Sequence, residues 1–436
     1  MDGHTMVERD DSRVSHPLLG RALQKTKYIK TMKGLLHWAV CIVCICQGAF
    51  SGAVGSQSQR RNPETAAAIR PQELFQQAEK DLQRGQKEAA LRIFRGLERD
   101  LPKSTKLELL MGTILANHEC YAEAQPFFAK ALALEPGLFD ACYNSALAYL
   151  RVDRPGKAVE ILNQVRPQDQ ERGDYRNLLG NAYWKLGDVS KAAAELQGAY
   201  LLEPSNEGYY LDAGSFFLEH YTPRAATEIF QAGLVRLPDS ARLHFAVAIS
   251  LLIVETWDKA TEHLEQALAK EPGFLPARFG LGYAYYNTGQ NEKAVRTLRD
   301  YIRLVPRDHN GYYYLALTLR RMGEEENSAE VKQLLERCLE LKPNFAPGCV
   351  QLAAVCNRQG DSRRAIDLLQ RSISLDPKHA APAHILLATV YRRLGNQAGA
   401  EGEAKIAQEL LDEEKSTDNP ERRQLQYVLQ QVRPSE

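Results

Sequence analysis

The sequence lacks an excess of charge of either sign, because 55 lysine and arginine residues balance 55 aspartate and glutamate residues over its 436 positions. A chain with a formal net charge of +0 has no global field that attracts nucleic acid or an anionic membrane surface. It also lacks a long apolar run, since the stretch from Leu35 to Cys46 is shorter than the roughly twenty residues that a membrane-spanning helix needs. The sequence therefore predicts no nucleic-acid partner, and membrane contact only through this N-terminal stretch.

Sequence motifs of metal and catalytic chemistry are also absent. The ten histidines are scattered and form no HExxH pattern. No Gly-x-Ser-x-Gly elbow and no phosphate-cradling glycine loop occurs, and Gly280-Leu281-Gly282 lies inside an apolar helical pattern. We therefore expect a protein that is not an enzyme and that binds no cofactor and no metal.

Residues 1–51 have the order of features that is typical of a secretory signal. Positively charged residues precede the apolar stretch, and small residues follow it between Ala49 and Gly55. We expect a signal peptide over residues 1–51, with Met32 as an alternative start, or else an uncleaved N-terminal anchor. Residues 52–70 show no periodicity and are predicted to form a flexible linker.

The feature that dominates the rest of the chain is a 34-residue period. An alanine column follows it at Ala90, Ala124, Ala158, Ala192, Ala226, Ala260 and Ala294. A column of small residues follows it at Ala78, Gly112, Ala146, Gly180, Gly214, Ala248, Gly282 and Ala316. A proline column follows it at Pro102, Pro136, Pro204, Pro238, Pro272 and Pro306. Three columns in one phase identify an array of repeats.

Each period predicts a pair of antiparallel helices. Between Asp174 and Pro204, Gly187 can adopt the left-handed conformation that ends a first helix, and Pro204 cannot continue a second one. Small residues allow close approach of the helices. One pair cannot bury both of its apolar faces, so the pairs are expected to stack.

Three periods carry a recognisable set of residues. These are Leu179-Gly180, Tyr183, Ala192, Leu196, Pro204; then Tyr210, Ala213-Gly214, Phe217, Ala226, Phe230, Pro238; then Leu281-Gly282, Tyr285, Ala294, Leu298, Pro306. Each set resembles the tetratricopeptide repeat. The resemblance covers residues 71–414 as about ten repeats. It implies an all-α, right-handed superhelical solenoid of antiparallel helix pairs, for which residues 415–436 would supply a capping helix and tail.

The sequence departs from the family pattern in several places. The tryptophan of the family is mostly replaced, by Tyr210, His244, Arg278 and Tyr312. The third repeat has a polar loop from Pro167 to Asp174 where its proline would stand, and the eighth gains about three residues near Glu324 to Asn327. The last repeat, with Leu387-Ala388, Tyr391, Gly395 and Ala400, is shifted by one more residue. The local geometry at these repeats is not predicted.

The resemblance implies a concave face, lined by the first helix of each pair, that binds peptides or extended segments of partner proteins. At the positions expected to face this groove the middle of the chain has aromatic and apolar residues, namely Tyr143, Trp184, Phe245, Leu252, Phe279, Tyr283, Tyr286 and Tyr313. Towards the C-terminus the same positions are basic, namely Arg320, Arg321, Arg358, Arg392 and Arg393.

This groove predicts a partner segment with apolar anchors and an acidic or C-terminal carboxylate end. Asn177, Asn181 and Lys185 resemble part of the carboxylate-binding set of co-chaperone members, but Leu211 and Asp212 depart from it. The structural alternative is that the aromatic residues fill the seams between repeats and the arginines form a solvated face.

Five cysteines follow the signal, at Cys120, Cys142, Cys338, Cys349 and Cys356. Cys349 and Cys356 lie seven residues apart on one predicted helix, beyond the reach of a disulfide. We expect both to be buried small apolar residues. A disulfide between Cys338 and Cys349, on consecutive helices, is left open as the alternative.

These observations together favour an exported scaffold that binds another protein or an extended peptide. Export combined with a long solenoid resembles bacterial proteins of envelope assembly or secretion, in the periplasm, secreted, or anchored to the inner membrane by an uncleaved N-terminal segment. The alternative is an intracellular or membrane-anchored adaptor of the co-chaperone type.

Overall fold

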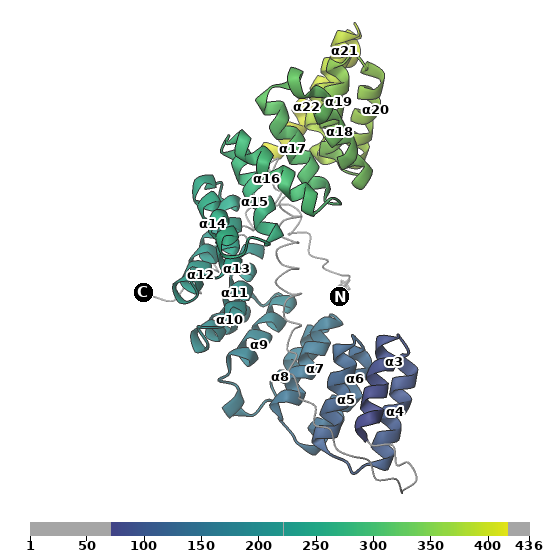
Figure 1. Ribbon diagram of the computed structural model, residues 1–436, viewed down its shortest axis with the longest axis vertical. Coiled ribbons are helices and arrows are strands. Elements are labelled where there is room, and N and C mark those ends of the chain that lie inside the picture. The colour runs from purple at the N-terminus through teal and green to yellow at the C-terminus, as the bar shows by residue number, and fades with distance from the viewer. Residues whose placement is uncertain (1–70, 221, 417–436) are drawn as a thin grey trace, which may run out of the picture. The chain divides into compact units, whose positions relative to one another are not determined.

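The computed structural model describes residues 71–220 and 222–416, and within them all regular structure is helical (Figure 1). The described helices pair in chain order as α3 (Pro71–Gln83) with α4 (Lys87–Asp100), α5 (Thr105–Asn117) with α6 (Tyr121–Leu134), α7 (Phe139–Arg151) with α8 (Pro155–Leu162), α9 (Gly173–Leu186) with α10 (Val189–Leu202), α11 (Glu207–Glu219) with α12 (Pro223–Arg236), α13 (Ala241–Ile253) with α14 (Trp257–Lys270), α15 (Leu275–Asn287) with α16 (Asn291–Leu304), α17 (His309–Met322) with α18 (Glu324–Leu341), α19 (Ala346–Arg358) with α20 (Ser362–Leu375), and α21 (Ala381–Arg393) with α22 (Gln397–Ser416). The predicted all-α solenoid of helix pairs is confirmed.

Several predictions fall on residues that the structure does not describe. The signal peptide or anchor at residues 1–51 and the linker at residues 52–70 lie outside the described residues, and so do residues 417–436 of the predicted cap. Among the described residues, none of the helices combines the length and the apolar composition needed to cross a membrane.

The described chain divides into two units, and each is treated separately. The N-terminal unit comprises residues 71–217 and 228–238, and the C-terminal unit comprises residues 218–220, 222–227 and 239–416. Within each unit a second helix packs on the first helix of the next pair, as α6 does on α7 and α16 on α17. First helices of consecutive pairs also contact each other, for example α7 with α9 and α15 with α17. We call the first helices of the C-terminal unit, α13, α15, α17, α19 and α21, the first-helix layer.

The small-residue column packs against a large residue sixteen positions later in the same pair. A Cβ atom at Gly214 would lie 2.1 Å from Cε1 of Phe230, and one at Gly180 would lie 2.8 Å from Cγ of Leu196. Phe230 and Leu196 are both buried. The column is therefore small because a fully buried ring or leucine of the second helix occupies the space where a side chain would begin.

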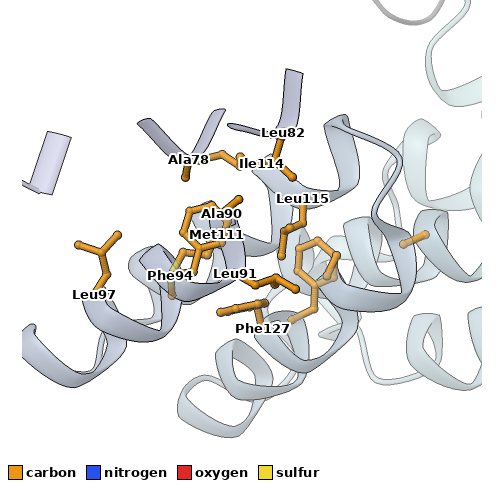
Figure 2. Close-up of a cluster of buried hydrophobic side chains, with 13 residues drawn as sticks. Ala78, Leu82, Ala90, Leu91, Phe94, Leu97, Met111, Ile114, Leu115 and Phe127 are labelled. Carbon is orange, nitrogen blue, oxygen red and sulfur yellow. The ribbon is translucent and has the colours of Figure 1, made fainter. Parts of the chain in front are cut away.

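Core clusters form where consecutive pairs meet. Figure 2 shows a cluster formed mainly by the first two pairs, in which Phe94 of α4 lies near Met111 of α5. The rings of Phe94 and Phe127 meet edge to face, with their centroids 6.0 Å apart. Burial of one aromatic or leucine side chain contributes about 1.5–3 kcal/mol. Stability thus comes from contacts between pairs as well as within them.

Most of the turns within the described pairs contain a residue in the left-handed conformation. Gly187 closes α9 with a φ of 76°, as the sequence predicts, and the Asp188 carboxylate then accepts a hydrogen bond from the backbone N–H of Lys191 at the start of α10. The 34-residue equivalents of Gly187 include three residues that are not glycine, namely Glu119, Asp153 and Glu255, with φ of 60°, 55° and 58°. These three residues hold a backbone conformation that favours glycine.

The two irregular repeats are accommodated differently. In the third pair the second helix, α8, ends at Leu162, and a short 3₁₀ helix, η3 (Pro167–Asp169), leads to α9. In the eighth pair the added residues lengthen α18 to 18 residues, compared with 14 in α16. The insertion therefore extends a helix by about one turn rather than enlarging a loop.

Three of the four residues that replace the family's tryptophan have a shared role that sequence reasoning missed. Tyr210 donates a hydrogen bond to the carbonyl oxygen of Pro204 at 3.3 Å, and Tyr312 donates one to that of Pro306 at 3.2 Å. The Arg278 guanidinium donates to the carbonyl of Pro272 in the same way. Each of these side chains satisfies a proline carbonyl in the connection between pairs.

Candidate protein-binding surface on the first helices

The two asparagines predicted to face the groove are held by an acidic side chain of the protein itself. The amide of Asn177 donates to Oδ2 of Asp212 at 3.0 Å, and the amide of Asn181 donates to the same oxygen at 3.3 Å. A carboxylate of the chain itself thus binds both asparagine amides, and a role for Asn177 and Asn181 in binding a partner stays a prediction.

The predicted aromatic residues of the N-terminal unit also contact neighbouring rings. Tyr143 is half-buried and stacks on Phe139 with centroids 5.5 Å apart, while Trp184 meets Phe216 edge to face at 5.6 Å. Burial, together with the charges of Asp174 and Asp212, raises the pKa of Tyr143. This tyrosine is therefore neutral at physiological pH.

In the C-terminal unit the predicted aromatic residues pack between consecutive helix pairs. Tyr283 and Tyr314 meet edge to face at 4.9 Å, and Tyr313 meets Phe345 at 5.0 Å. All the predicted apolar residues of this unit are buried, namely Phe245, Leu252, Phe279, Tyr283, Tyr286 and Tyr313. These positions match the structural alternative of seam-filling residues, and a role for them in binding stays a prediction.

Two of the five predicted arginines bind the backbone of the preceding pair. The Arg321 guanidinium lies 4.0 Å from the ring centroid of Tyr286 and donates to the carbonyl oxygen of the same residue, in the last turn of α15. Arg393 donates to the carbonyl oxygen of Asn357, in the last turn of α19. A cation at a helix C-terminus satisfies carbonyl groups that lack a partner within the helix. Both arginines therefore join consecutive pairs.

The other three predicted arginines lie on consecutive first helices of the C-terminal unit. Arg320 of α17 is half-buried and donates to the side-chain oxygen of Gln351 in α19, and burial lowers its pKa. Burial also lowers the pKa of Arg358, and the nearby charge of Arg320 lowers it further. Arg392 of α21 is exposed. Positive charge is thus concentrated on three adjacent helices of one layer.

Two other features accompany these arginines. The side-chain oxygen of Asn357 is buried and accepts no hydrogen bond from the described residues, and Asn357 as a whole is only 8% exposed. Ile385, also on α21, is an apolar side chain that is 48% exposed. We call Arg320, Arg358, Ile385 and Arg392 the arginine surface. It combines guanidinium donors with one exposed apolar side chain, and the buried Asn357 directly precedes Arg358 in the sequence.

The cysteines of the described chain are all free thiols. Cys142, Cys338, Cys349 and Cys356 are buried, and burial raises the pKa of Cys142 to about 11 and that of Cys338 to about 12. The prediction of buried small apolar residues for Cys349 and Cys356 is confirmed. The alternative disulfide between Cys338 and Cys349 is not formed.

Comparison with family models identifies the repeat. Models described as tetratricopeptide repeat match residues 119–182 and 251–317, residues 173–206, and residues 349–381. These matches fall on the helix pairs described above. The chain is a tetratricopeptide repeat (TPR) protein. TPR arrays are scaffolds for protein–protein interaction, and this chain has the helix pairs of such a scaffold.

Curated relatives of this TPR protein are much longer than the matched part. Human protein O-mannosyl-transferase TMTC3 is 22% identical over 63% of this chain and 32% of its own length. Human interferon-induced protein with tetratricopeptide repeats 2 is 31% identical over 31% of this chain and 29% of its own length. Human mitochondrial import receptor subunit TOM70 is 19% identical over 59% of this chain and 44% of its own length. The matched part of this TPR chain therefore spans less than half of the length of each of these relatives.

Solved structures similar to this TPR protein have low sequence identity. A TPR protein fragment from Cytophaga hutchinsonii is 15% identical, with a TM-score of 0.45 over 55% of this chain and 98% of that one. The Cut9 and Hcn1 complex of the APC/C gives a TM-score of 0.38 at 16% identity, over 81% of this chain and 89% of that one.

Proposed function

We propose that this TPR protein binds an extended segment of another protein along its first-helix layer, and that an acidic part of the segment lies on the arginine surface. The observation that carries the proposal is the proximity of Arg320 and Arg358, which come from consecutive first helices. The charge of Arg320 destabilises the charge of Arg358, and carboxylate oxygens placed between them would be bound by both guanidinium groups. An acidic ligand is therefore the chemistry that this surface fits.

The spacing of the arginine surface also restricts the partner. Ile385 and Arg392 lie seven residues apart on α21, which is about 10.5 Å along a helix axis. An extended chain covers that distance in about three residues. The proposal therefore favours a segment in which an apolar residue stands about three positions from an acidic one.

The repeats are proposed to bind rather than to catalyse. The relative TOM70 is a receptor subunit by name, which supports a binding role, whereas the relative TMTC3 is named a transferase. The chain covers 32% of TMTC3, and we infer that the likeness concerns its repeats.

A selection from a random-peptide library tests the proposed surface. We expect the full chain to enrich peptides that carry an acidic residue about three positions from an apolar one. Arg392→Glu should weaken the selected peptides about tenfold or more, because it replaces a charge-assisted donor with a like charge. Arg363→Glu, at another exposed arginine that lies on the second helix α20, is the matched control and should bind normally. Equal loss in both variants, or no acidic enrichment, would show that the arginine surface is not the site.

We further propose that the chain is exported and acts in envelope assembly or secretion, in the periplasm or outside the cell. The support is the order of charged, apolar and small residues in residues 1–51. N-terminal sequencing of the protein recovered from its own cells should begin after this segment. Retention of Met1 or Met32 would instead favour an intracellular or membrane-anchored adaptor.

A further inference from the structure

A cluster of charged side chains joins the first two helix pairs, far along the chain from the arginine surface. Glu98 comes from α4, Glu108 from the first turn of α5, and Lys130 from α6. The Lys130 ammonium donates to Oε1 of Glu98, and the charges of both side chains act on the Glu108 carboxyl. The cluster therefore connects three helices by side chains alone.

Glu108 is the most buried member of this cluster. It is 4% exposed, and its Oε2 is buried without a hydrogen bond from any of the described residues. A buried carboxylate without a full set of donors is costly, whereas a protonated carboxyl can donate to its neighbour. The burial of Glu108 therefore favours the protonated form of its carboxyl.

The charges around Glu108 act in opposite directions. Burial and the negative charge of Glu98 raise its pKa, and the positive charges of Lys130 and Lys103 lower it. The balance raises the pKa of Glu108 to about 7, from an ordinary value near 4.5. Protonation of this carboxyl therefore changes within the physiological range.

We propose that Glu98, Glu108 and Lys130 form a proton-controlled tie between the first and second helix pairs, which holds while the Glu108 carboxyl is protonated and loosens when it ionises. Loosening would act locally, because in a solenoid each pair contacts only its neighbours and α3 with α4 stands at the end of the described array. The opening would therefore expose apolar surface of α5 without unfolding the later pairs.

The sign of the pH dependence follows from the direction of the shift. A carboxyl whose folded pKa is raised binds more protons when folded than when open, so its stabilisation is complete below its ordinary pKa near 4.5 and is lost as the pH rises towards 7. Between pH 6 and pH 8.5, this predicts about a tenfold fall in the protection of amides that exchange through the opening of α4 from α5.

Hydrogen exchange of the full chain at pH 6 and pH 8.5, corrected for the intrinsic rate, tests the tie. In the wild-type protein we expect the protection of the α4 and α5 amides to fall about tenfold from pH 6 to pH 8.5. In Glu108→Gln, whose side chain has a similar shape but cannot ionise, protection should be equal at the two pH values. Glu88→Gln, at an exposed position of α4, is the matched control and should show the same fall in amide protection as the wild-type protein. Unchanged wild-type protection, or an undiminished fall in Glu108→Gln, would overturn the proposal.

A second variant keeps the test decisive should Glu108→Gln not fold. Lys130→Met removes a charge that lowers the pKa of Glu108, so the midpoint of the fall should move to higher pH. A midpoint that does not move, or moves to lower pH, would contradict the proposed tie. Both readouts concern the first two pairs, so their outcome is independent of peptide binding at the arginine surface.

Discussion

At the residue scale, the periodic small and large residues were predictable from the sequence and the direction of the aromatic side chains was not. Gly214 and Phe230 stand in two columns of one period, and their contact follows from the stacking of two helices. Tyr283 and Tyr286 occupy positions from which a ring can point into a groove or into the seam with the next pair. The choice depends on the packing of rings such as Tyr314, which the period does not determine.

The close contact at Gly214 leads to a stability prediction. Gly214→Ala should destabilise the protein by about 1–3 kcal/mol, because the new methyl group meets the buried ring of Phe230 and the gain in helix propensity is only about 1 kcal/mol. The free energy of unfolding in urea, measured for the full chain, gives the difference.

Two further variants make the prediction for Gly214 specific. Gly96→Ala, where nothing lies within 4 Å of the added carbon in α4, should be stabilising by up to about 1 kcal/mol. Phe230→Leu combined with Gly214→Ala should recover part of the loss, since it recreates the alanine and leucine combination of Ala248 and Leu264. If Gly214→Ala were as stable as Gly96→Ala, the explanation of the small-residue column would fail.

At the element scale, helix pairing was predicted well, and the turns within pairs were predicted only where a glycine marks them. Gly187 indicated the end of α9, and the structure confirms it. Glu119 and Glu255 take the same left-handed conformation, but a glutamate gives no local signal for it. Only alignment of these residues with Gly187 on the 34-residue period could have found them.

The left-handed turn between α13 and α14 provides the next prediction. Glu255→Gly should stabilise the protein by about 0.5–1 kcal/mol. A side chain at positive φ costs roughly 1–2 kcal/mol, and part of this gain is offset because glycine loses more conformational entropy on folding. Glu262→Gly, at an exposed site inside α14, should instead cost about 1 kcal/mol. Thermal unfolding of the two variants compares these effects, and destabilisation in both would contradict the assignment of strain to the turn.

At the scale of the whole molecule, the repeat architecture could be read from the sequence because each level of the pattern repeats with one period. The surface that binds a partner could be read only in part. The five arginines were identified from the period. In the structure, however, Arg321 and Arg393 each bind a carbonyl oxygen at the C-terminus of the preceding first helix, about 35 residues earlier in the chain. Ile385 and Asn357 were missed, since a lone exposed isoleucine or buried amide has no signature in the sequence.

The central claim is that an acidic partner segment binds the first helices α17, α19 and α21. A crystal structure of the full chain with a selected acidic peptide tests this claim most directly. The account predicts an acidic side chain of the peptide within hydrogen-bond distance of Arg358 or Arg392, and an apolar one against Ile385. A peptide that lies on the second helices, with these three residues uncovered, would contradict it.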